Sequence, residues 1–152
     1  MTIENERQLE KLRVIGRIVA NVLQRMMRHA EPGMTTAELD ACGAMLLEQE
    51  GARSAPQLAY NFPGATCISV NEEVAHGIPG ARVLQPGDMV NVDVSAEKDG
   101  FFADTGGSFV IPPVSADRQR LCAATREALN NAMREARAGQ PLNRIGKAIE
   151  QT

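Results

Sequence analysis

The chain has 152 residues, of which 43% are hydrophobic and 23% charged, so it is long enough to bury a core and too apolar for a disordered protein. Its 16 Lys and Arg against 19 Asp and Glu give a net charge of −3, and only 3% of the residues are aromatic. These values argue against a nucleic-acid interface, which needs basic surface or stacking platforms. The 3 cysteines are widely separated and form no CxxC pair, which predicts free thiols.

The sequence carries no signal for membrane targeting. Its first residues, MTIENERQLEKLR, are too polar for a signal peptide. It also contains no apolar run of about 18 residues, the length needed to span a bilayer. The expectation is a cytoplasmic protein without membrane contact.

Two helices are predicted in the first third of the chain. Apolar residues recur at intervals of three and four from Leu9 to Met27, which is typical of an amphipathic helix. A second helix is predicted from Thr35 to Gly51, because Thr35 and Glu38 have the spacing of a capping box.

The remaining chain changes from loop to strands and back to helices. A loop rich in Pro, Gly and Asn is expected at 54–64, followed by a strand at 66–70. Residues 83–112 alternate between β-branched or aromatic and polar side chains, which indicates further strands. Helices are predicted at 115–138 and 141–152. Mixed helices and strands without a linker or repeat predict a single α+β domain.

A predicted hairpin presents two carboxylates. From Met89 to Ala96 the valines fall on one face of a strand, and Asp93 and Ser95 fall on the other. The returning strand, Phe101 to Ile111, carries Asp104.

The length of the loop decides how these carboxylates face each other. A two-residue loop at Asp99 and Gly100 places Asp104 opposite Ser95 and diagonal to Asp93, whereas a loop centred before Asp99 places Asp104 directly opposite Asp93. In either register both carboxylates share one face, with about 5–8 Å between their Cβ atoms.

Two adjacent ionised carboxylates repel each other, so a cation between them would stabilise the hairpin. Oxygen ligands of this kind suit a divalent ion such as Mn, Fe, Co or Mg. The alternative is that Asp93 and Asp104 lie on a solvated sheet face, each satisfied by a lysine or a backbone amide.

The two histidines occupy different settings. His29 follows two arginines at the end of the first predicted helix, where a surface position favoured by the helix dipole explains it. His76 directly precedes a Gly-Ile-Pro-Gly turn. A histidine held on such a turn can hydrogen-bond a substrate carbonyl or a leaving amine, and the alternative is a loop histidine bonded to backbone.

The motifs together resemble those of the methionine aminopeptidases, and most closely the bacterial type I enzymes. Three segments carry the resemblance: CISVNEEVAHGIPG, LQPGDMVNVDVSAEKDGFFADTGGSFVI and LCAATREALNNAMREARAG. The resemblance implies the α+β pita-bread (creatinase/aminopeptidase) fold and removal of methionine from the N-termini of nascent proteins in the cytoplasm. It also implies that the whole chain, residues 1–152, is one domain holding only the first half of that fold.

The resemblance further implies roles for individual residues. Asp93 and Asp104 match the first two carboxylate ligands of a site for two divalent metal ions (Co, Mn, Fe or Zn). His76 matches the histidine that contacts the substrate and stabilises the tetrahedral intermediate. Phe62 and Cys67 match residues that line the methionine pocket, and the expected partner is a peptide or nascent protein beginning with Met.

Two departures from the family pattern limit what is expected of this chain. Ala59, Tyr60 and Asn61 differ from the Tyr-His pair that normally precedes the pocket segment. The histidine and two glutamates that complete the family's metal site have no counterpart after Asp104. The expectation is therefore a truncated form with an incomplete metal site and little activity of its own.

Two other functions remain open from the sequence. One is a non-catalytic binding or assembly module, which would self-associate through the exposed surface of a half-fold. The other is a different peptidase of the same superfamily, such as a proline-specific or creatine-hydrolysing enzyme.

Overall fold

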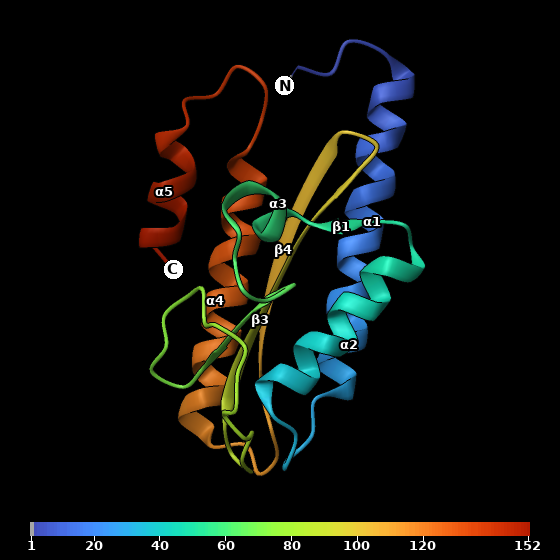
Figure 1. Cartoon of the computed structure of the whole chain (residues 1–152). Coiled ribbons are helices and arrows are strands. Elements are labelled where there is room, and N and C mark those ends of the chain that lie inside the picture. The colour runs from blue at the N-terminus through green and yellow to red at the C-terminus, as the bar shows by residue number, and fades with distance from the viewer. Residues whose placement is uncertain (1) are drawn as a thin grey trace. The chain divides into compact units, whose positions relative to one another are not determined.

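The computed structural model describes residues 2–152. The chain divides into two compact units, one reaching Pro113 and one spanning Val114–Thr152. In chain order the described part of the first unit contains α1 (Glu6–His29), α2 (Thr36–Gln49), β1 (Arg53–Ser54), α3 (Ala55–Tyr60), β2 (Cys67–Val70), β3 (Met89–Lys98) and β4 (Phe101–Val110) (Figure 1). The expectation of a single domain stays a prediction.

The sheet is built around β3, and all of its described pairings are antiparallel. One edge of β3 pairs with β4 along its whole length. The other edge pairs with β2 in the first half of β3 and with β1 near its end. Representative pairs are Lys98↔Phe101 with β4, Cys67↔Asp93 with β2 and Arg53↔Glu97 with β1. A central strand with three neighbours gives its side chains fixed positions.

One face of β3 forms the core together with α1. Val90, Val92, Val94 and Ala96 are fully buried, as the alternation of a strand requires. The helix contacts both β3 and β4 and runs alongside the hairpin (Figure 1). Its buried residues, spaced by three and four, are Ile15, Ile18, Val19, Val22, Leu23 and Met26. The opposite face of β3 is thereby left for polar side chains.

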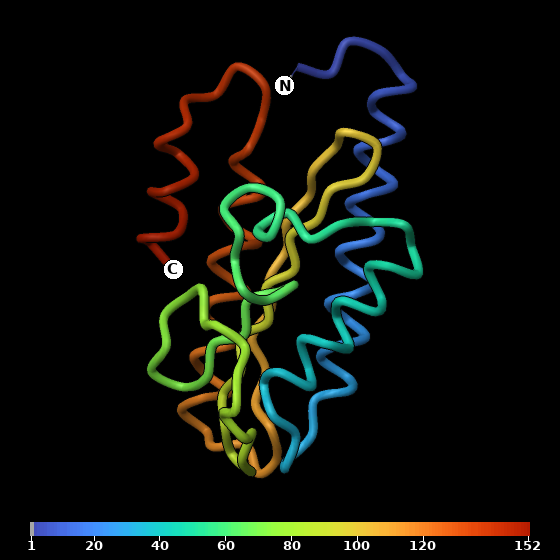
Figure 2. Tube along the Cα trace, in the orientation of Figure 1, coloured from blue at the N-terminus to red at the C-terminus, as the bar shows by residue number. Residues whose placement is uncertain are grey.

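The second helix is anchored to the first by a close contact and begins with the predicted cap. Glu38 N–H donates to Thr35 Oγ1 at 3.1 Å, and Thr35 N–H donates to Glu38 Oε2 at 2.8 Å. At Gly43 the helices approach so closely that a Cβ would lie 2.7 Å from Met26 Sδ. The traces of α1 and α2 accordingly run side by side (Figure 2).

The turn between β3 and β4 decides the register of the hairpin. Asp99 and Gly100 have φ values of 54° and 84°, the left-handed geometry of a two-residue hairpin turn. The resulting pair is Ser95↔Asp104, so the register with a two-residue loop is the correct one of the two considered.

The loop predicted at 54–64 is partly wrong, because β1 ends at its first residue and the short helix α3 lies within it. Ser54 Oγ accepts a hydrogen bond from Gln57 N–H at 3.4 Å and caps the helix. Pro56 lies in the first helical turn, where a missing N–H costs nothing. The helix ends at Asn61, which has a left-handed φ of 56°.

The second unit contains α4 (Ala116–Glu135) and α5 (Asn143–Glu150). They confirm the two helices predicted there, although both are shorter than expected. Arg144 Nε donates to Glu135 Oε2 at 2.7 Å and links the two helices. Within residues 2–152, no helix is both long and apolar enough to cross a membrane.

Candidate functional site

The two predicted carboxylates lie on one face of the hairpin. Asp93 and Ser95 are half-buried on the face of β3 opposite the valines. Asp104 is paired with Ser95 and is therefore diagonal to Asp93, whose own partner on β4 is Gly106. Because Gly106 has no side chain, the space beside Asp93 stays open on that strand.

The surroundings of Asp93 disfavour its charge. Burial, followed by the neighbouring Asp104 carboxyl, raises the pKa of Asp93 to about 6 from a usual value of 3.8. His76 acts in the opposite direction and lowers this pKa, which places it within electrostatic reach of the carboxylate pair. A cation between the two carboxylates would reduce the electrostatic repulsion between Asp93 and Asp104.

The carboxylate pair offers oxygen atoms of the type that metal ions bind. Carboxylate oxygens are donors that hard divalent cations accept. However, residues 2–152 contain no cluster of three or more His, Cys, Asp and Glu side chains able to hold a metal ion. Asp93 and Asp104 therefore fit one side of a metal site and do not enclose an ion themselves.

His76 is held by an unusual backbone and a tight contact. It has a left-handed φ of 55°, which is uncommon for a residue with a side chain. The following Gly77 donates its N–H to Ser69 Oγ at 3.1 Å, and its carbonyl accepts the N–H of Ile68 at 3.0 Å. A Cβ at Gly77 would lie 2.1 Å from the Ile68 oxygen. The chain after His76 is thus fixed against β2.

The turn that leads to His76 contains positioning residues to which the sequence assigned no role. The Asn71 side chain donates to Asp88 Oδ1 at 2.8 Å and accepts from Met89 N–H at 3.0 Å. Glu73 Oε2 accepts from Val70 N–H at 2.7 Å. Two features of the sequence point to Asn71: it lies in the segment CISVNEEVAHGIPG, and Asn tolerates the left-handed φ of 57° found there.

The two predicted pocket residues have different neighbours. Cys67 is buried and lies directly opposite Asp93 in the sheet. Burial, and then the charges of Asp93 and Asp104, raise the pKa of the Cys67 thiol to about 11, so it is a neutral thiol at physiological pH. Phe62 is half-buried and packs edge-on against Tyr60, with ring centroids 6.1 Å apart.

The chain is similar to known peptidases over most of its length. The model of metallopeptidase family M24 matches residues 10–152. Methionine aminopeptidase 2 of Bacillus subtilis (strain 168) is 48% identical over 150 residues, which are 98% of this chain and 60% of that protein. Methionine aminopeptidase of Escherichia coli (strain K12) is 40% identical over 152 residues, which are 99% of this chain and 58% of that protein. The chain thus spans about three fifths of the length of these curated relatives.

Solved structures show the same relationship. A crystal structure of methionine aminopeptidase from Rickettsia prowazekii has a TM-score of 0.94 and 32% identity, covering 99% of this chain and 61% of that one. Prolidase from Pyrococcus furiosus has a TM-score of 0.85 at 16% identity, covering 98% of this chain and 43% of that one. At so low an identity the likeness to prolidase concerns the fold alone.

Proposed function

The chain belongs to metallopeptidase family M24, and from that premise we propose that its residues serve the removal of N-terminal methionine from peptides and nascent proteins in the cytoplasm. Relatives named methionine aminopeptidase, 40% and 48% identical over almost the whole chain, support this substrate. The observation that carries the proposal is the placement of Asp93 and Asp104 on one face of the hairpin, with His76 in electrostatic reach.

Membership of a metallopeptidase family implies divalent metal ions. In our proposal there are two, drawn from Co, Mn, Fe or Zn, and Asp93 and Asp104 supply part of their ligands. A divalent cation held by these residues would supply activation of a water molecule and polarisation of the scissile carbonyl. The pKa of Asp93, raised to about 6, still leaves the carboxylate mainly ionised at neutral pH and available as a ligand.

The chain's own residues would bind and orient the peptide. His76, which precedes the close contact of Gly77 with β2, would donate a hydrogen bond to the oxygen on which negative charge develops. Cys67, a neutral thiol, and Phe62 would form a soft apolar wall for the thioether of the first residue. The left-handed backbone at His76 pre-organises this arrangement.

A chimera tests the proposal on a complete fold. Residues 1–152 would replace the matching part of the Bacillus subtilis relative, which covers 60% of that protein, and the remainder would come from the relative. We expect this chimera to release methionine from a Met-Ala-Ser peptide in the presence of Mn or Co. Asp93→Asn and Asp104→Asn should lower kcat/KM by at least about 100-fold, and His76→Ala by about 10²–10⁴-fold.

The matched control is Asp99→Asn, at the tip of the same hairpin, where the side chain is exposed and lies 3.9 Å from Lys11. It should leave methionine release unchanged. A folded chimera that is inactive, or one that keeps its rate after Asp93→Asn, would contradict the proposal. The chain of 152 residues by itself should release methionine far more slowly than the chimera, because its described residues bring only two carboxylates to the metal.

The same chimera separates methionine removal from proline-specific cleavage. The likeness to prolidase extends over 98% of the chain at the level of the fold. We expect hydrolysis of Met-Ala-Ser and no hydrolysis of an Ala-Pro dipeptide. The reverse preference would assign the chain to the proline-specific branch.

A further inference from the structure

A concave surface lies between α1 and α2, and neither carboxylate of the pair lines it. It is a cavity of about 460 Å³. Its lining residues are Arg25, Arg28 and His29 from the end of α1, and Cys42, Met45 and Leu46 from α2. We call this surface the α1–α2 cavity. None of these residues takes part in the site described above.

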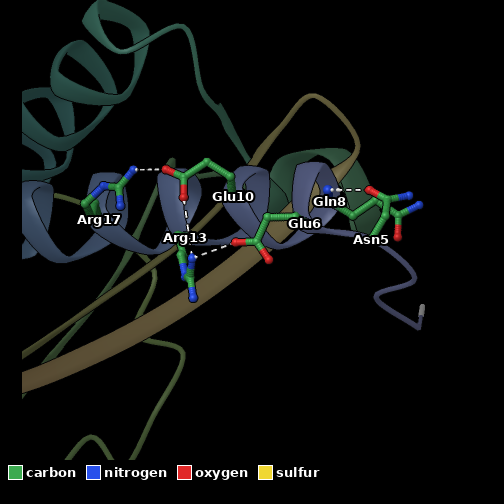
Figure 3. A network of polar contacts seen from close by, with 6 residues as sticks. All are labelled: Asn5, Glu6, Gln8, Glu10, Arg13 and Arg17. Atoms are coloured by element: carbon green, nitrogen blue, oxygen red, sulfur yellow. Dashed lines mark hydrogen bonds and ion pairs between the residues drawn. The ribbon is translucent and has the colours of Figure 1, made fainter.

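The arginines of α1 differ in whether they form ion pairs. In the first half, Arg13 Nη1 lies 3.2 Å from Glu6 Oε1, and Arg17 Nη2 lies 2.7 Å from Glu10 Oε1 (Figure 3). These ion pairs join residues seven positions apart, about two turns along an exposed face of the helix. Arg13 and Arg17 are thus each paired with a glutamate of the same helix, whereas Arg7 in the first turn has no ion pair among the described residues.

The second half of α1 has no such partners. The sequence contains no acidic residue from Ile18 to Ala30. Within residues 2–152 the side chains of Arg25 and Arg28 form no ion pair and no side-chain hydrogen bond. Two unpaired guanidinium groups and His29 thus border the cavity in a chain whose net charge is −3.

The helix dipole explains only part of this pattern. Basic groups at a helix C-terminus offset the dipole, and Arg28 and His29 lie in the last turn of α1. That effect falls off within the last turn, and Arg25 precedes it. Arg25 therefore has no ion-pair partner among residues 2–152, and it lines the cavity.

The floor of the cavity is apolar and adaptable. Leu46 is buried, Cys42 is half-buried, and Met45 is 48% exposed. An exposed methionine is flexible and polarisable, which suits it to different apolar side chains. No aromatic ring lines the described cavity, so it offers no platform for stacking a nucleic-acid base.

We propose that the α1–α2 cavity binds an acidic segment of a partner protein. An apolar side chain of that segment would pack on Met45 and Leu46, while flanking carboxylates would pair with Arg25 and Arg28. Arginine is suited to this role because its planar guanidinium forms two parallel hydrogen bonds with a carboxylate. The proposal is independent of the peptidase activity, because it uses a different surface.

Fluorescence anisotropy of the full chain tests the proposal. The probe is a fluorescein-labelled peptide with aspartates on both sides of a single leucine. We expect saturable binding that weakens with added salt. The double variant Arg25→Gln/Arg28→Gln should weaken binding by about tenfold or more. The matched control Arg13→Gln/Arg17→Gln removes the same charge from the same helix and should change the affinity less than about twofold.

A second measurement locates the peptide. Cys42 lies in the cavity, whereas Cys122 lies on α4, and both are half-buried. Bound peptide should slow alkylation of Cys42 by iodoacetamide without slowing alkylation of Cys122, as measured by peptide mass spectrometry. This readout does not depend on the folding of a variant.

Several outcomes would overturn the proposal. These are equal loss of affinity in the two double variants, equal protection of the two cysteines, or unchanged binding when the leucine of the probe is replaced by serine. Tighter binding of a labelled uridine oligomer that depends on Arg25 and Arg28 would replace the protein partner with RNA and would also overturn it.

Discussion

Asp40 on α2 holds Thr66, the residue directly before β2, by two hydrogen bonds to the same carboxylate oxygen. Its Oδ1 accepts from Thr66 N–H at 2.7 Å and from Thr66 Oγ1 at 2.7 Å, and its Oδ2 accepts from Ala65 N–H at 3.0 Å. Thr66 is fully buried and precedes Cys67, the strand residue that pairs with Asp93. One helical carboxylate therefore sets the position of the strand beside the candidate metal ligands.

Replacing Asp40 with Asn should destabilise the fold around β2. The amide offers one acceptor where the carboxylate offers two, and its NH₂ would face backbone donors. We expect the free energy of unfolding to fall by about 1.5–3 kcal/mol, the range for hydrogen bonds to charged groups. Urea denaturation followed by circular dichroism measures this change. Glu48→Gln, on an exposed position of the same helix, should have no effect.

Adding a methyl group at Gly77 should disturb His76. Because the new Cβ would lie 2.1 Å from the Ile68 oxygen, the backbone has to move or the contact with β2 has to open. We expect Gly77→Ala to cost about 1–3 kcal/mol of stability and to lower kcat of the chimera more than it raises KM. Gly80→Ala is the matched control, since its Cβ would have no neighbour closer than 3.9 Å. Equal effects of the two substitutions would contradict this account.

The features that local patterns encode could be predicted from the sequence. The capping box at Thr35 depends on two residues three positions apart, and the structure confirms both of its hydrogen bonds. Strand alternation and the Asp99-Gly100 turn predict that Asp93 and Asp104 lie on the same face of the hairpin. The turn also limited the possible registers of the hairpin to two. The motif order indicated the pita-bread family, and the peptidase relatives covering the chain confirm the fold.

Contacts between distant residues could not be predicted in the same way. Asp40 and Thr66 are 26 positions apart, and an aspartate in an amphipathic helix usually faces water. The short helix α3 could not be recognised because Pro56 and the following Asn61, Pro63 and Gly64 are residue types typical of loops. The unpaired state of Arg25 likewise depends on which side chains α2 brings near it, and no local pattern contains that information.

The stability of the metal-free chain should depend on the ionisation of Asp93. Its pKa is raised from 3.8 to about 6 in the folded chain, so folding favours the protonated form. The resulting stabilisation is complete below the unfolded pKa and is lost as pH rises through about 6. In EDTA, thermal unfolding should show Asp93→Asn to be more stable than the wild type at pH 8, by about 1–3 kcal/mol. The difference should shrink toward pH 4.

If the carboxylate pair binds the metal, added Mn should make the wild type more stable than Asp93→Asn at pH 8. Ionised Asp93 would then have a cation beside it, and only the wild type would gain stability. Asp99→Asn serves as the control and should follow the wild type at every pH, with and without Mn. A stability difference in EDTA that does not change with pH would show that the repulsion between Asp93 and Asp104 is not its source.

Glu97 joins β1 to the end of the hairpin. Its ionisation should stabilise the fold, whereas ionisation of Asp93 should destabilise it. Its Oε1 accepts from Gly100 N–H at 2.6 Å, and its Oε2 lies 2.7 Å from Arg53 Nη2. The side chain is 6% exposed. The backbone N–H of Gly100, and then the Arg53 guanidinium, lower the pKa of Glu97 below its usual 4.5.

Because that pKa is lowered on folding, Glu97 stabilises the chain above its unfolded pKa, and this contribution is lost as pH falls through the folded value. Glu97→Gln should therefore reduce the free energy of unfolding at pH 7 by about 1–3 kcal/mol. The difference between the two proteins should be smaller at pH 3 than at pH 7, because protonation removes the Glu97 charge that the fold stabilises. Urea denaturation at both pH values measures this, with the exposed Glu31→Gln as control. An equal loss at both pH values would mean that Glu97 acts through packing, because packing does not depend on its charge.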